Sequence, residues 1–171
     1  MRRILAFVAP LALAFAVSAC GSIGGSPTAP SDLQKNLNSA PPGAFEISTQ
    51  EITVRFWFVF TPAPGSAVGP GDPTRWEFNC RASSGVNYTV SLKFTVMAPD
   101  GSVVNSLFPA SIDRSTTVCA PGNVASFTGP ASPAFKGIKE VRMATTLGPA
   151  ASASGSTATA SFVQPLDWSM R

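Results

Sequence analysis

The sequence predicts an all-β protein, built as a single antiparallel β-sandwich of about seven strands. From Phe45 onward, several segments alternate apolar and polar residues with a period of two, and loops rich in proline and glycine separate them. No segment after Phe45 has the spacing of a long amphipathic helix. Immunoglobulin-like and transthyretin-like architectures are the natural candidates. The antibody type is disfavoured, because no Trp follows Cys80 by about a dozen residues.

The strand predicted at residues 51–60 is the most apolar and is the expected centre of the core. Its inward face carries Ile52, Val54, Phe56, Phe58 and Phe60. Its other face carries Thr53, Arg55, Trp57 and Val59. Two interpretations of that second face remain open: the strand is buried on both faces, or the face carrying Trp57 is open.

Six further strands follow. Residues 74–81 and 86–97 alternate cleanly, and the inward set of the first is Trp76, Phe78 and Cys80. A turn of Ala-Pro-Asp-Gly at 98–101 is expected to close a hairpin onto 102–108, and 109–123 is predicted to be irregular. The last strands are predicted at 124–128, 138–147 and 156–163. The loops 61–73 and 129–137 are rich in proline and are candidate recognition loops.

The chain has three cysteines, Cys20, Cys80 and Cys119. In an exported chain, Cys80 and Cys119 are expected to form a disulfide, with two buried free thiols as the alternative. The bridge would close a loop of about 40 residues and stabilise the fold by roughly 4 kcal/mol.

The first twenty residues predict export. Arg2 and Arg3 precede an apolar run from Ile4 to Val17, which is too short and too interrupted by Pro10 for a membrane-spanning helix. The run ends in Val-Ser-Ala before Cys20. This ending resembles the lipobox of bacterial lipoproteins; an ordinary secreted protein and an uncleaved anchor are the alternatives.

The resemblance implies that residues 1–19 are removed as a signal peptide and that Cys20 receives lipid, which anchors the protein to the membrane. Gly21 takes the position where aspartate retains such proteins at the inner membrane, so delivery to the outer membrane is implied for a Gram-negative source. Residues 20–44 are predicted to be a flexible tether rich in Gly, Ser and Pro, and 45–171 the sandwich domain. Ser31 and Gln34 have capping-box spacing for a short helix in that tether.

Charge excludes a nucleic-acid partner. The chain carries 12 Lys/Arg and 9 Asp/Glu, but Arg2 and Arg3 leave with the signal peptide, so the mature chain is almost neutral. No basic run is present after Cys20.

The residue types also argue against an enzyme. The chain has no histidine, which excludes Ser-His-Asp catalysis and imidazole metal ligands. Asp72 and Glu77 are the nearest approach to a catalytic carboxylate pair, but one lies in a turn sequence and the other on a wet strand face. We expect no catalytic residues, no cofactor and no metal.

The expected function is therefore binding. The first hypothesis is a non-enzymatic protein-binding or assembly accessory of the cell envelope, and the alternative is a module that binds carbohydrate or cell wall through exposed aromatics. Candidate binding residues are Trp57 with Arg55 beside it, and Trp168 in the tail, since Trp and Arg are frequent in binding hot spots. The competing interpretation of Trp168 is that it covers one end of the domain's own core.

Overall fold

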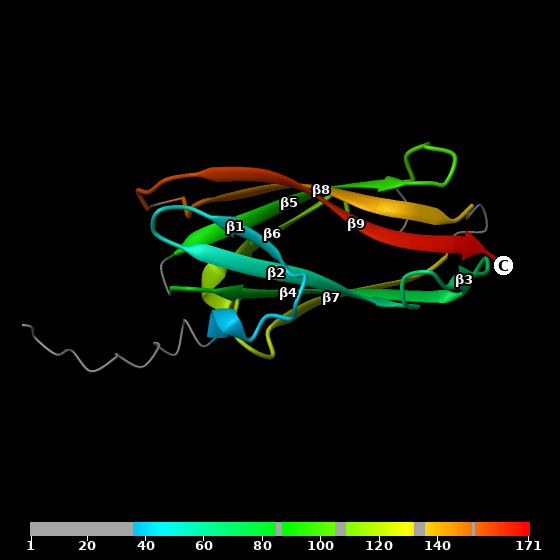
Figure 1. Ribbon diagram of the computed structural model, residues 1–171, viewed down its shortest axis with the longest axis horizontal. Helices are drawn as coiled ribbons and strands as arrows, with labels where there is room; N and C mark the ends of the chain where they lie inside the picture. Colours follow the sequence, from blue (N-terminus) through cyan, green and yellow to red (C-terminus); the bar gives the residue numbers. More distant parts are fainter. Residues whose placement is uncertain (1–35, 85–86, 105–108, 132–135, 152) are drawn as a thin grey trace, which may run out of the picture.

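A computed structural model describes residues 36–84, 87–104, 109–131, 136–151 and 153–171 (Figure 1). It is all-β, with a single 3-10 turn, η1, at Thr116–Val118. The strands are β1 Phe45–Ser48, β2 Thr53–Thr61, β3 Ala67–Val68, β4 Pro73–Ala82, β5 Tyr88–Met97, β6 Ser111–Ser115, β7 Val124–Pro130, β8 Ile138–Pro149 and β9 Ala158–Met170.

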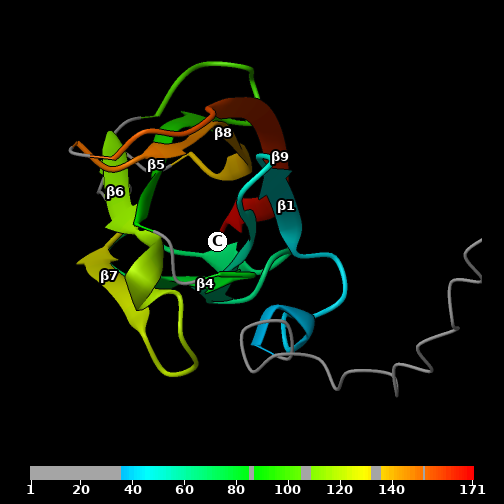
Figure 2. The same ribbon diagram turned by 90° about the vertical axis from the view of Figure 1, so that its left-hand side faces the viewer.

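The strands form two sheets that face each other across one core (Figure 2). The first sheet has the order β1-β2-β4-β7, and the second has the order β3-β9-β8-β5-β6. All pairs of neighbouring strands are antiparallel except the short β3, which runs parallel to β9. The predicted all-β, two-layer arrangement is thereby confirmed.

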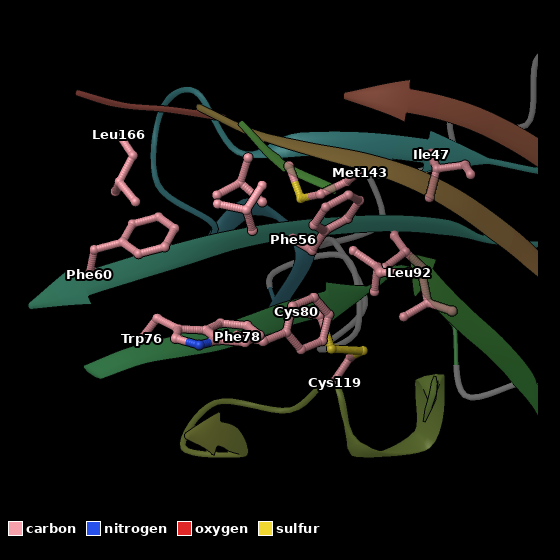
Figure 3. Packing of buried hydrophobic residues seen from close by; sticks show 14 of the residues in the cluster. Ile47, Phe56, Phe60, Trp76, Phe78, Cys80, Leu92, Cys119, Met143 and Leu166 are labelled. Atoms are coloured by element: carbon pink, nitrogen blue, oxygen red, sulfur yellow. A yellow bond between two sulfur atoms is a disulfide. The ribbon is translucent and has the colours of Figure 1, made fainter. Parts of the chain in front are cut away.

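The core lies between the inward faces that the alternation predicts (Figure 3). On β2, Val54 and Phe56 are fully buried. On β4, no more than 2% of the surface of Trp76, Phe78 or Cys80 is exposed. The rings interlock: Trp76 stacks on Phe127 of β7 with ring centroids 4.3 Å apart. Such offset aromatic pairs add to the stabilisation that burial already gives.

The predicted disulfide between Cys80 and Cys119 is confirmed, with Cα atoms 4.8 Å apart. Cys80 lies near the end of β4, and Cys119 follows η1 directly. The bridge therefore fastens the η1 segment to the first sheet at a point beyond the end of the β4–β7 pairing, which stops at Asn79 and Val124.

The prediction that 109–123 is irregular was wrong in part. Residues 111–115 form β6, which pairs with β5 from Thr89 to Lys93. The segment SIDRS is short, and four of its five residues are polar, so its pattern is too weak to predict a strand. The turn at 98–101 is confirmed, with Gly101 at a φ of 82° and Ala98 donating to the Ser102 carbonyl. Of the predicted partner strand 102–108, residues 105–108 lie outside the described part, and Val103 makes an isolated bridge with Met97.

The last strand is longer than predicted and includes most of the segment after Val163 that was expected to be a tail. β9 continues to Met170 through a register shift opposite Ile138 and Glu140, with Asp167 at a positive φ of 47°. Pro165 and this irregularity interrupt the alternation, so the pattern in the sequence stops at Val163 although the strand continues to Met170.

The predicted loop 61–73 contains the short strand β3, which pairs with β9, and further hydrogen bonds fasten the segment to β9. Gly65 N donates to Leu166 O at 2.8 Å, and the Trp168 indole donates to Ala63 O at 3.1 Å. Asp72 then accepts from the guanidinium of Arg171 at 3.1 Å. This loop therefore closes one end of the sandwich. Of the second candidate recognition loop, 129–137, residues 132–135 lie outside the described part.

Residues 36–44, assigned to the tether by their composition, pack against the body. Residues 36–38 form a helical turn on the outer side of the first sheet, below β4 in Figures 1 and 2. Leu37 is 4% exposed, and Asn36 Nδ2 donates to Cys119 O at 3.0 Å. The packed body therefore begins before Phe45.

The predicted signal peptide, the predicted lipidation site Cys20 and the part of the predicted tether up to residue 35 lie outside the described residues. Within the described part, no helix is long and apolar enough to cross a membrane.

Candidate functional site

Trp57 and Arg81 form the centre of the outer face of the first sheet. Trp57 lies on β2 and Arg81 on the neighbouring β4, where Arg55 and Arg81 are direct partners in the register. The Arg81 guanidinium carbon is 5.0 Å from the centroid of the Trp57 ring, within the range of a cation–π contact. Trp57 is half-buried, so the first sheet is not covered on both faces.

Hydrogen bonds on several sides hold Arg81 over the ring. Its Nε donates to Ser39 Oγ at 3.1 Å, and an Nη donates to Cys80 O at 2.7 Å. Partial burial lowers the pKa of the Arg81 guanidinium, which nevertheless stays protonated because an arginine pKa is so high. The N-terminal segment, the disulfide and the central strand thus meet at this one side chain.

Arg55 extends the same row of side chains toward the sheet edge. Its Nε donates to Glu46 Oε2 of β1 at 2.8 Å, so Glu46, Arg55 and Arg81 lie in sequence across three strands. A shallow hollow of about 340 Å³ adjoins this row, lined by Glu46, Arg55 and residues 40–44.

The rest of the face is polar apart from two exposed valines, Val59 of β2 and Val124 of β7. Val59 is 47% exposed and lies two residues from Trp57 on the same face of β2. Opposite it on β4 is Glu77, which forms an ion pair with Arg75. Beyond β4, Ser126 of β7 accepts from Arg75 Nε at 3.0 Å. The face offers an aromatic ring, guanidinium groups and two exposed valines, all on regular strands.

The two tryptophan candidates have different surroundings. Trp168 is 1% exposed and packs edge-on against Phe60 with ring centroids 6.2 Å apart. Its indole N–H donates a hydrogen bond to Ala63 O. Trp168 is thus part of the core, as the competing interpretation of the tail holds, and it does not join Trp57 and Arg55.

Arg81, Glu46 and Ser39 were missed as members of this site. The alternation in 74–81 does place Arg81 outward, but nothing in the sequence gives the register that sets it beside Trp57. Ser39 comes from a segment whose composition is that of a linker. Only the pairing of β2 with β4 brings these residues together.

The carboxylates considered for catalysis are used in ion pairs. Asp72 binds Arg171 and accepts from Gly69 N at 2.6 Å, whereas Glu77 binds Arg75. In the described residues, no group of three or more Cys, Asp or Glu side chains is arranged to hold a metal ion. The side chains described on the outer face of the first sheet can make van der Waals contacts, hydrogen bonds and ion pairs.

Comparison of the chain with protein-family models, with curated proteins and with solved structures finds no match.

Proposed function

We propose that this protein is a lipid-anchored, non-enzymatic accessory of the cell envelope that binds a protein partner through the outer face of its first sheet. The observation that carries the proposal is the gathering of Arg55, Arg81 and the exposed Val59 around Trp57 on two central strands. Trp and Arg dominate binding hot spots, which lie near the centre of an interface with polar residues around them.

A protein partner fits this face better than a glycan. A sugar ring stacks on a free aromatic face, but one side of the Trp57 ring is in contact with the Arg81 guanidinium, which Ser39 and Cys80 hold in place. A protein surface can instead pack on Val59 and the edge of Trp57 while it accepts hydrogen bonds from Arg55 and Arg81. A sugar that stacks on the side of the Trp57 ring that Arg81 contacts would require Arg81 to move.

The lipid anchor is proposed from the sequence of residues 1–20. The helical turn at 36–38 docks on the outer side of the first sheet, so the chain leading from Cys20 reaches the body on the same side as Trp57. The remaining tether, residues 21–35, spans at most about 50 Å when fully extended. The binding face is therefore kept close to the membrane.

The anchor is tested by blocking its processing. Globomycin should make the precursor accumulate, and Cys20→Ala should release the protein from the membrane fraction or leave it as precursor. Normal maturation and membrane retention of Cys20→Ala would refute lipidation at this residue without touching the proposed binding face.

The binding face is tested by affinity capture from cells. Trp57→Ala and Arg81→Ala should each lose a partner that the unchanged protein retains. The control is Val163→Ala on the second sheet, where Val163 is as exposed as Val59 is on the first, and this variant should keep the partner. Circular dichroism checks that each variant is folded. Polysaccharide in the eluate, with a shift of tryptophan fluorescence on adding that glycan, would favour the carbohydrate alternative.

The finer architecture is proposed to be immunoglobulin-like in the second sheet. The order β9-β8-β5-β6 corresponds to the G, F, C and C′ strands of that architecture. The first sheet differs from the immunoglobulin arrangement. In this protein β4 lies beside β2 in the same sheet, whereas the third long strand of an immunoglobulin domain lies in the other sheet. The transthyretin-like architecture remains the alternative.

A further inference from the structure

Among the described strands, β7 is an edge of the first sheet with no neighbour on its outer side. β7 pairs with β4 on one side, and on its other side no strand of the described chain is bonded to it (Figure 2). Its sequence, VASFTGP, contains no charged residue. The edge strands β1 and β6 are shorter and carry Glu46, or Asp113 and Arg114. Charges and short length protect an edge from pairing with another chain, and β7 lacks both protections.

The backbone geometry shows which groups of β7 point outward. Pro73 and Pro130 face each other in the register, and neither has an N–H, so they form a non-hydrogen-bonded pair. The bond from Ala131 N to Asp72 O at 2.8 Å flanks this pair as expected. Because the two kinds of pair alternate, the amides and carbonyls of Val124, Ser126 and Thr128 point away from β4.

The two ends of this edge complement each other. Val124 at the start of β7 is 38% exposed on the outer face. At the other end, Thr128 and Pro130 border a hollow of about 480 Å³, whose remaining lining includes Pro73, Arg75 and Thr61. An antiparallel copy of β7, related by a two-fold axis at Ser126, would lie with its Val124 opposite Thr128, at the rim of this hollow.

We propose that β7 pairs with β7 of a second copy of this chain, in antiparallel register centred on Ser126, to join two first sheets into one. Because of the two-fold axis, each end of one β7 strand lies beside the opposite end of the other β7 strand. The contact between Val124 and the hollow is therefore made twice in the dimer. Ser126 faces itself and Val124 faces Thr128 on both sides, which gives roughly six backbone hydrogen bonds. An extended strand of the same uncharged sequence satisfies the outward amides and carbonyls of Val124, Ser126 and Thr128.

The register makes a sharp crosslinking test. In a hydrogen-bonded antiparallel pair, facing Cα atoms are about 5.5 Å apart, within the range that a disulfide spans. Ser126→Cys in the full, processed protein should form a disulfide-linked dimer on a non-reducing gel. Ser161→Cys, on the exposed face of β9, is the matched control. At about 10 μM protein, pairing holds the two thiols at roughly millimolar effective concentration, so S126C should crosslink about 100-fold faster than S161C.

A second variant tests the same contact without a thiol. Ser126→Pro removes an outward amide, so the β4–β7 ladder stays intact while the central bonds of the dimer are lost. Light scattering should give twice the monomer mass for the unchanged protein and the monomer mass for S126P. Equal crosslinking of S126C and S161C, or a monomeric unchanged protein at the same concentration, would overturn the proposal. So would crosslinking of S126C only to a different protein, which would make β7 an edge for a foreign strand.

Discussion

At the scale of single residues, Thr145 has an unusual environment. It is 2% exposed on the inward face of β8, and its Oγ1 has no hydrogen-bond partner among the described residues. A buried hydroxyl without a partner costs about 1–3 kcal/mol relative to one that is satisfied. This cost is borne in the middle of the second sheet, where the neighbours of Thr145 in the register are Leu92 and Ala160.

Thr145→Val should therefore stabilise the protein. The isosteric methyl group removes the unsatisfied hydroxyl, and the free energy of unfolding should rise by about 1 kcal/mol. Urea denaturation measures the change. Thr146→Val, the exposed neighbour on the outer face, is the control and should change stability by less than about 0.5 kcal/mol. A less stable T145V would show that the hydroxyl has a partner.

Glu51 joins the two sheets through its carboxylate. Its Oε2 accepts from Ser156 Oγ and from Tyr88 Oη, the latter at 3.0 Å, so the β1–β2 turn is bonded to the start of β5 and to the segment before β9. The hydrogen bond from Ser156, followed by those from Thr49 and Tyr88, lowers the pKa of Glu51 from 4.5 to about 2.

The stability that Glu51 contributes should depend on acid pH. Its pKa is lower in the folded state, so the contribution is fully present above about pH 4.5 and is lost as pH falls toward 2. Thermal unfolding of the unchanged protein and of Glu51→Gln, followed from pH 7 to pH 2, should show a Tm difference that is constant above pH 5 and then shrinks. Parallel pH profiles for the two proteins would contradict the hydrogen-bonded carboxylate.

At the scale of elements, the segment 36–44 is part of the folded body although it has the composition of a linker. Leu37 is buried, and Ser39 and Asn36 make hydrogen bonds to the body. Leu37→Ala should therefore lower the free energy of unfolding by about 2–3 kcal/mol, as removal of a buried leucine side chain does. Urea denaturation of the full chain measures it, and an unchanged midpoint would return this segment to the tether.

The disulfide is the second element that fastens the body. It joins residues 39 positions apart, and its removal releases η1 from the first sheet. Replacing both cysteines, as Cys80→Ala with Cys119→Ala, should lower the free energy of unfolding by about 2–5 kcal/mol. Alkylation without reductant checks the premise, since labelling of both sulfurs in the unchanged, unfolded protein would mean that the bridge is absent.

The elements differ in how far the sequence predicts them. β2, β4 and β5 alternate without interruption, so their inward faces are read correctly from the period of two. β6 is too short and too polar for its sequence pattern to predict a strand. The pattern of β9 is interrupted by Pro165 and by the register shift near Asp167. Burial of Leu37 depends on contacts with residues far along the chain, which a local pattern does not contain.

At the scale of the whole molecule, the layer architecture follows from alternation, but the site does not. Trp57 and Arg55 lie on one strand, and their shared face is predictable because two-residue steps keep the same side. Arg81 reaches Trp57 only because β4 pairs with β2 in one register, and a shift by one residue would turn Arg81 inward. Sheet order and register are long-range properties, and they decide which side chains form the proposed binding face.

The central claim is that the outer face of the first sheet holds a protein partner in the envelope. A photo-crosslinking amino acid at Val59 or at Val163 tests it, because both side chains are 47% exposed and they lie on opposite sheets. In living cells, the probe at Val59 should capture one or two envelope proteins in a fixed ratio, and Trp57→Ala in the same chain should abolish that capture. Identical products from Val59 and Val163, or none from Val59, would contradict the account.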